Sequence, residues 1–337
     1  MDKTSLGDRM KEYENVTRNK LIRRTPVIIR LDGKAFSTLT SKMDKPYDND
    51  FKDIMMKVSE YLVENIMGCK LAYVQSDEIS LLLIDYNTLE TEAWFDNNIQ
   101  KIASVSASMA TAKFNEIYRN ISEIKKVVDF GLFDSRVFNL PKEEVCNYFI
   151  WRQNDATRNS IQGLGQKEFG HKEMHGKNTS QVQDKLMLEK NINWNDVDTY
   201  FKRGGCVYRG VNYQRIVRSE PVYDDPNSFV PSKTIQVSGI GYRREIIVDN
   251  DIPVFTQDRE YIDMHIYEIV QTSILDKYMT RGNSILTPKV LVDAASALLE
   301  EPTYDVFKDP CMNIISTAES KELINVASTI LEEPENE

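Results

Sequence analysis

Apolar and polar residues alternate along the first 140 positions in blocks that predict six secondary-structure elements. Four apolar runs bounded by turn residues predict strands, at residues 26–33, 71–74, 79–84 and 133–140. Two stretches with apolar residues every three or four positions predict amphipathic helices, at residues 48–66 and about 97–118. The order strand, helix, strand, strand, helix, strand predicts an α+β, ferredoxin-like fold, with an antiparallel sheet and helices on one face.

The remaining sequence divides into segments of different character. Residues 5–20 predict a polar N-terminal helix, and Pro141 is well placed to open a long helix. A basic, strand-like stretch follows to about residue 258, and the sequence beyond about 262 is helical and then acidic. We therefore divide the chain into a palm-like core (1–140), a long helix with a basic β-rich region (141–260) and a helical C-terminal extension (261–337).

Composition narrows the class of protein. Four cysteines are scattered through 337 residues without a C-x-x-C pair, which argues against a disulfide framework or zinc site and fits a reducing compartment. The N-terminal residues are charged from the second position, unlike a signal peptide, and no stretch approaches the roughly 20 apolar residues of a membrane span. We expect a cytoplasmic protein with no membrane association.

The net charge of −10 is unevenly distributed. Residues 288–337 hold 11 acidic and 3 basic residues, so the other 287 positions hold 41 acidic and 39 basic residues. A nearly neutral body can still present basic patches, and the overall charge therefore does not exclude an RNA partner.

Acidic residues follow two of the predicted strands. Asp32 and Gly33 end the first strand, and Asp77 and Glu78 lie between the second and third. Carboxylates brought together by neighbouring strands repel one another, and Mg²⁺ commonly resolves this by binding them with substrate phosphates. Polymerase and nucleotidyl-cyclase palms have such an arrangement, with two metal ions between the carboxylates. The alternative is structural, because Asp-Gly is also a common turn dipeptide.

Basic and polar residues in the second half indicate phosphate or RNA binding. Arg152, Asp155 and Asn159 share one face of the predicted long helix, which suits either a bound triphosphate or base, or a solvated helix face. Arginines and tyrosines are interleaved between residues 209 and 244, as expected for RNA or for a charged sheet edge. The residues expected to contact RNA are Arg152, Lys177, Lys202, Arg203, Arg209, Arg243 and Arg244.

Several motifs in one order resemble the tRNA(His) guanylyltransferase superfamily, whose enzymes extend RNA in the 3′-to-5′ direction. They are RLDGKAFS, AYVQSDEIS, FDSRV, WRQNDATRNS, HGKNTS, INWND and KRG, and the resemblance as a whole covers roughly residues 5–260. The resemblance implies a polymerase-like palm that uses two Mg²⁺ ions. It also implies that Asp32 and Asp77 supply carboxylate ligands and Gly33 a backbone carbonyl, with Glu78 as a further catalytic residue. The nucleotide-binding residues that the resemblance implies are Lys34, Ala35, Phe36, Ser76, Lys101, Arg136 and Asn159.

In this family the 5′-monophosphate of a tRNA is activated with ATP, and the 3′-hydroxyl of a nucleoside triphosphate then attacks the activated end. Departures from the tRNA(His)-specific eukaryotic pattern resemble the guanylyltransferase-like branch: Thr157 stands where a histidine is expected, and Ser135 where FDGRV has glycine.

We therefore expect template-directed repair of tRNA 5′ ends with ATP, GTP or other NTPs, by a homotetramer. The alternatives are addition of a single G to tRNA(His), a palm-type nucleotide cyclase, and a non-catalytic RNA-binding module.

Overall fold

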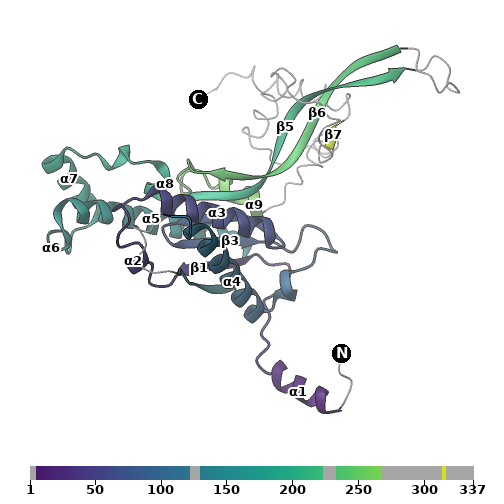
Figure 1. Cartoon of the computed structure of the whole chain (residues 1–337), viewed down its shortest axis with the longest axis horizontal. Helices are drawn as coiled ribbons and strands as arrows, with labels where there is room; N and C mark the ends of the chain where they lie inside the picture. Colours follow the sequence, from purple (N-terminus) through teal and green to yellow (C-terminus); the bar gives the residue numbers. More distant parts are fainter. Residues whose placement is uncertain (1–4, 122–129, 223–232, 267–312, 316–337) are drawn as a thin grey trace. The chain divides into compact units, whose positions relative to one another are not determined.

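A computed structural model describes residues 5–121, 130–222, 233–266 and 313–315 of the chain (Figure 1). The chain divides into two compact units. Unit 1 comprises residues 1–209 and 246–267, and unit 2 comprises residues 210–245 and 268–337. The palm and the acidic residues of interest all belong to unit 1.

The palm has the predicted order of elements, which confirms the α+β fold. Its elements are β1 (Val27–Gly33), α3 (Asn49–Asn65), β2 (Cys69–Gln75), β3 (Glu78–Leu83), α4 (Ile99–Tyr118) and β4 (Phe133–Asn139). The sheet runs in the order β4-β1-β3-β2-β5-β6-β7, and β1 pairs antiparallel with both β3 and β4. The first four strands in this order, β4-β1-β3-β2, form the ferredoxin-like arrangement expected from the sequence.

Helices cover both faces of this sheet. One core cluster packs the apolar residues of α3 and α4 against Val27, Ile29 and Leu31 of β1. The opposite face, which includes Ile28, is covered by α5 (Lys142–Phe169) and α9 (Glu260–Ile266). The palm's own long helices thus lie on one face, as predicted. The second helical layer is added by residues that follow the palm, because Ile28 and its neighbours on that face are also apolar and require cover.

The strand register places several polar residues of the palm on the face of the sheet that α5 covers. Asp32 of β1 lies opposite Glu78 of β3, and Arg30 lies opposite Ser80. On the other side of β1, Arg30 is paired with Arg136 of β4. Because side chains alternate between faces along a strand, these polar residues share the face that α5 covers.

Side-chain caps fix where the palm helices begin. The Asp48 carboxylate accepts the backbone N–H of Phe51 at the start of α3, and the Asn98 side chain accepts that of Lys101 at the start of α4. Such caps satisfy backbone donors that have no partner within the helix. The 3₁₀ turn η1 (Trp94–Asn97) leads into α4, and a short α2 (Phe36–Leu39) follows β1.

A small helical cluster beyond the C-terminal half of α5 was not predicted. It contains α6 (His171–Met174), α7 (Thr179–Lys190), η3 (Trp194–Asp196) and α8 (Thr199–Arg203). Its core includes Ile161, Leu164 and Val182. Gly165 of α5 contributes close packing, because a Cβ there would lie 2.5 Å from the Val182 side chain.

The stretch predicted to be basic and strand-like forms two long strands. Two long strands, β5 (Gly205–Val222) and β6 (Lys233–Asp249), fulfil the strand prediction for this stretch, and α1 (Ser5–Asn15) is shorter than predicted. Of the predicted C-terminal extension, only α9 and β7 (Asn313–Ile315) lie within the described residues. No helix in the described ranges has the length and apolar character that a membrane crossing requires.

Candidate active site

The two acidic motifs meet at one end of the sheet. Ser76 and Asp77 form a two-residue turn between β2 and β3, and the backbone N–H of Gly33 donates to the Asp77 carbonyl at 3.1 Å. Ser76 adopts a left-handed conformation with φ 48°, which is uncommon for a residue other than glycine and is found disproportionately at functional sites. This geometry brings Asp32 and Asp77 to neighbouring strand ends, as the sequence predicted.

Asp77 is held in an environment that disfavours its charge. Burial raises the pKa of Asp77 to about 6, the charges of Asp32 and Glu78 add to the effect, and hydrogen bonds from the turn backbone and from Ser76 oppose it. Neither Asp32 nor Asp77 forms an ion pair with a basic residue in the described part of the chain. A cation in front of these carboxylates would therefore stabilise their ionised forms.

Glu78 has a different environment from its neighbour Asp77. Its carboxylate accepts two hydrogen bonds from Arg152 of α5, from Nε at 2.7 Å and from Nη2 at 2.8 Å. Arg152 also donates to Asp155 at 3.0 Å. Burial lowers the pKa of Arg152, but its hydrogen bonds to Glu78 and the charges of Glu78 and Asp155 outweigh this, so its pKa is raised. Arg152 therefore remains charged within a buried acid–base cluster.

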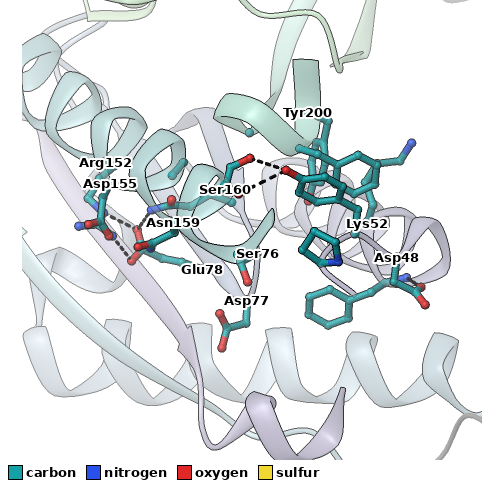
Figure 2. A pocket seen from close by; sticks show the side chains of 18 of the residues that line it. Asp48, Lys52, Ser76, Asp77, Glu78, Arg152, Asp155, Asn159, Ser160 and Tyr200 are labelled. Atoms are coloured by element: carbon teal, nitrogen blue, oxygen red, sulfur yellow. Dashed lines mark hydrogen bonds and ion pairs between the residues drawn. The ribbon is translucent and has the colours of Figure 1, made fainter. Parts of the chain in front are cut away.

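A pocket of about 360 Å³ adjoins the acidic turn (Figure 2). One side is formed by α5, including Asn159 and Ser160, and the other by the start of α3 and by α8. The rings of Tyr47 and Phe201 stack with centroids 4.8 Å apart. Figure 2 shows Asp77 and Ser76 between these two sides. The volume and the mixture of aromatic and polar groups are typical of small-molecule sites.

The residues that follow Asp32 fall into two groups. Gly33 requires the absence of a side chain, because a Cβ there would lie 2.6 Å from the Phe36 ring. Phe36 itself is buried among the rings of Phe114 and Phe133, so only its backbone faces the loop. Lys34 and Ala35 are exposed, and Ala35 has φ 56°.

The predicted basic residues are not all near the pocket. Arg136 is half-exposed on edge strand β4, on the face that carries Asp32. Lys101 begins α4, which packs on the other face. Farther along α4, the Ser106 hydroxyl is hydrogen-bonded to that of Ser135, and the Thr111 hydroxyl accepts the backbone N–H of Phe133, which pairs with Gly33 in the sheet. Because α4 thus runs toward the Asp32 end of the sheet, Lys101 at its start lies toward the opposite end. The described chain thus does not bring Lys101 to the pocket.

Arg30 is a candidate that the sequence reasoning missed. It lies opposite Arg136, its guanidinium is 5.8 Å from the centroid of the Trp151 ring, and its buried Nε has no hydrogen-bond partner among the described residues. Arg136 also forms an ion pair with Asp134, at 4.0 Å. Two neighbouring arginines, one of them with an unsatisfied buried N–H, favour a bound anion. The signal was present in the sequence, since Arg30 lies two residues before Asp32 and must share its face.

Most of the predicted RNA-contacting residues have partners within the fold. Lys202 donates to the carbonyl of Asn195, and Arg203 to that of Ile252. Arg209 donates to two carbonyls at the end of α3, and Arg152 is buried against Glu78. Lys177 is partly exposed. Arg243 and Arg244 lie in β6, and their side chains are outside the described part of the structure.

Comparison with known proteins gives consistent results. Residues 7–141 match the tRNAHis guanylyltransferase family model. A bacterial tRNA(His) guanylyltransferase (Thg1)-like protein, solved in complex with ATP, is 45% identical, with a TM-score of 0.65 over 78% of this chain and 99% of that one. A GTP complex of such a protein is 42% identical, with a TM-score of 0.61 over 78% of this chain and 100% of that one. The tRNA(His) guanylyltransferase of the yeast Debaryomyces hansenii is 27% identical over 61% of this chain and 81% of its own length.

The palm sheet and these relatives place the chain among the palm-type nucleotidyltransferases, which are enzymes. More narrowly, the chain belongs to the tRNA(His) guanylyltransferase family.

Proposed function

We propose that this enzyme adds nucleotides to the 5′ end of tRNA in the 3′-to-5′ direction, by template-directed repair. The observation that carries the proposal is the meeting of Asp32 and Asp77 beside a pocket large enough for part of a nucleotide. Phosphoryl transfer requires alignment and charge neutralisation more than acid–base side chains, and this arrangement can supply both.

The pocket is the proposed site of the activating nucleoside triphosphate. The solved relatives bind ATP and GTP, which supports nucleotide occupancy here. The Tyr47–Phe201 pair offers an aromatic wall, and Asn159 offers an amide for hydrogen bonding. Ser76 lies at the acidic end of the pocket, where the phosphates would be held. Lys34 and Ala35 follow in the loop after Gly33, and the Lys34 backbone N–H donates to the Leu132 carbonyl at 2.8 Å.

The donor groups at the acidic end fit Mg²⁺. Two carboxylates, from Asp32 and Asp77, and the backbone carbonyl of Gly33 are oxygen ligands of the kind that Mg²⁺ takes together with water and phosphate oxygens. The raised pKa of Asp77 is consistent with an uncompensated acidic site. The described residues contain no cluster of three or more metal-binding side chains, so phosphate and water would complete the coordination. When bound, Mg²⁺ would neutralise charge on the leaving groups, pyrophosphate in the activation step and AMP in the transfer step, and would lower the pKa of the hydroxyl that attacks in the transfer step.

Within this scheme the protein holds and aligns the reacting groups. Arg30 and Arg136, paired across β1 and β4, would bind phosphate oxygens on the face that carries Asp32. The tRNA 5′-phosphate displaces pyrophosphate from ATP, which gives an adenylylated end. The 3′-hydroxyl of the incoming NTP then attacks that end and releases AMP. Removal of pyrophosphate from the added nucleotide restores a monophosphate.

Sequence identity to the known relatives favours the repair activity over addition of a single G to tRNA(His). The bacterial Thg1-like structures are 45% and 42% identical, whereas the D. hansenii enzyme is 27% identical. The sequence also has Thr157 where the tRNA(His)-specific pattern has histidine.

The decisive experiment offers the enzyme a 5′-monophosphorylated tRNA that lacks its first nucleotide, with ATP, Mg²⁺ and each NTP in turn. We expect addition only of the nucleotide that pairs with the opposite base. Addition of G regardless of pairing, and only to tRNA(His), would support the alternative. An enzyme that extends no RNA under these conditions refutes the proposal. Assembly as a tetramer and a cytoplasmic location remain predictions, and light scattering tests the first.

A further inference from the structure

Glu78 and Arg152 form a buried pair directly beside the acidic turn. Their exposed fractions are 9% and 6%, and the guanidinium contacts both carboxylate oxygens, at 2.7 and 2.8 Å. Removing two charges from water is costly, so such a pair persists only when its geometry and hydrogen bonding are nearly complete.

The hydrogen bonding of Glu78 leaves little room for another ligand. Its Oε1 also accepts from Gln75 at 3.3 Å and from Ser80 at 3.4 Å, and Ser80 in turn is 2.8 Å from the Tyr148 hydroxyl. In Figure 2 the Glu78 side chain points toward Arg152 and Asp155, whereas Asp77 points away from them. Adjacent carboxylates of one turn thus have different surroundings.

The Glu78–Arg152 ion pair bears on Asp77 because Asp77 and Glu78 are consecutive residues of the chain. Glu78 follows Asp77 directly, and Gln75 and Glu78 are the residues that close the two-residue turn. Arg152 therefore fastens that turn to α5, the helix that also lines the pocket with Asn159. Movement of Glu78 would rotate the peptide that carries the Asp77 carboxylate.

We propose that Arg152 and Glu78 are positioning residues: their ion pair holds the Ser76–Asp77 turn so that Asp77 faces Asp32 for Mg²⁺–nucleotide binding, and Glu78 is not itself a metal ligand. This inference rests on the proposed function. It reassigns Glu78 from direct catalysis and Arg152 from RNA contact. Outer residues that orient metal ligands typically change metal affinity by about 10- to 100-fold when they are mutated.

A set of variants separates positioning from direct participation. Arg152→Met leaves the buried Glu78 charge without its partner, Glu78→Gln removes the charge, and the double variant removes both. The primary readout is the Mg²⁺ concentration for half-maximal binding of a fluorescent ATP analogue, with the melting temperature measured in parallel. Arg158→Met is the matched control, because Arg158 contacts Asp155 on the same helix but is 63% exposed and does not touch Glu78.

We expect Arg152→Met to raise the required Mg²⁺ concentration by about tenfold, with the control unchanged. Glu78→Gln should have a similar or smaller effect, because the amide keeps an acceptor oxygen for Arg152, and the double variant should lose no more than Arg152→Met alone, since both residues act through one contact.

Two results would overturn the inference. Arg152→Met could leave the Mg²⁺ requirement unchanged, whether or not it lowers the melting temperature, or Glu78→Gln could raise that requirement more than Arg152→Met does. The second result would make Glu78 a direct participant. Unchanged Mg²⁺–ATP binding by Asp77→Asn would instead refute the metal site of the proposed function, independently of the ion pair.

Discussion

His265 is expected to make the stability of this protein fall steeply in mild acid. The side chain is 7% exposed in α9, and its ring packs against the rings of Tyr208 and Tyr261, with centroids 4.8 and 6.2 Å away. Its buried Nε2 has no hydrogen-bond partner among the described residues. Burial lowers the pKa of His265 to about 3, and the nearby positive charge of Lys70 adds to the effect.

The sign and size of the effect follow from proton linkage. In the unfolded chain His265 binds a proton below about pH 6.5, whereas in the folded protein it stays neutral until about pH 3. Protonation therefore favours the unfolded state increasingly as the pH falls from 6.5 toward 3. The cost is about 1.4 kcal/mol for each pH unit, so at pH 4.5 this one residue should remove about 2.7 kcal/mol of unfolding free energy.

Urea titrations of the wild type and of His265→Phe between pH 7.5 and 4.5 test this reasoning. The variant keeps an aromatic ring and cannot titrate, so the stability difference between the two proteins should shift by about 2.7 kcal/mol in favour of the variant. Comparing the two proteins cancels the titration of carboxylates they share. The chain has only three histidines, and His171 and His175 are exposed, so NMR can follow the His265 ring directly.

The reasoning would be refuted if the unfolding free energies of the two proteins changed in parallel with pH. It would also be refuted if NMR showed that the His265 ring titrates near pH 6.5. Either result would mean that water reaches this ring in the folded protein.

Three further predictions concern the site and the core. Asp77→Asn should lower nucleotide addition by about a thousandfold without lowering the melting temperature in the absence of Mg²⁺, because it removes repulsion between carboxylates; a gel assay and calorimetry check this. Gly204→Ala should cost about 2 kcal/mol or more in urea unfolding, since Gly204 has φ +86° and a Cβ would lie 2.4 Å from the Val74 carbonyl oxygen. Gly170→Ala, with φ +83° and open space, should cost only about 1 kcal/mol, and equal costs would contradict the steric argument. Phe114→Ala should cost about 3–5 kcal/mol in the same assay, because the ring is fully buried, and a cost below about 1 kcal/mol would contradict its place in the core.

The palm was predictable because each of its elements has a strong local pattern. The apolar run before Asp32 and the three- and four-residue spacing in α3 each indicate one structure, and the cap at Asp48 marks where α3 begins. The meeting of Asp32 with Asp77 followed from the order of strands and needed no side-chain detail.

The cover of the second face and the partner of Glu78 were not predictable in the same way. The pairing of Glu78 with Arg152 joins residues 74 positions apart, and its geometry depends on how α5 crosses the sheet. The helices α6 and α8 have only four and five residues, too few for a periodic pattern to predict them. α7 has 12 residues and begins with a capping box of Asn178 and Gln181, a local signal that the sequence reasoning missed. Arg203 and Arg209, which we predicted to contact RNA, each donate to backbone carbonyls of the fold, a structural role that local sequence does not reveal.

The two-residue turn between β2 and β3 also limits how this enzyme can diverge or be engineered. Both strands are interior, with β1 on one side and β5 on the other, so neither can slide to absorb an added residue. A change of length at positions 76–77 that shifted β3 by one residue would turn Glu78 and Ser80 toward the core that holds Ile79 and Leu81. Libraries that seek new nucleotide preferences should therefore keep the length of this hairpin constant and vary the helical wall opposite it.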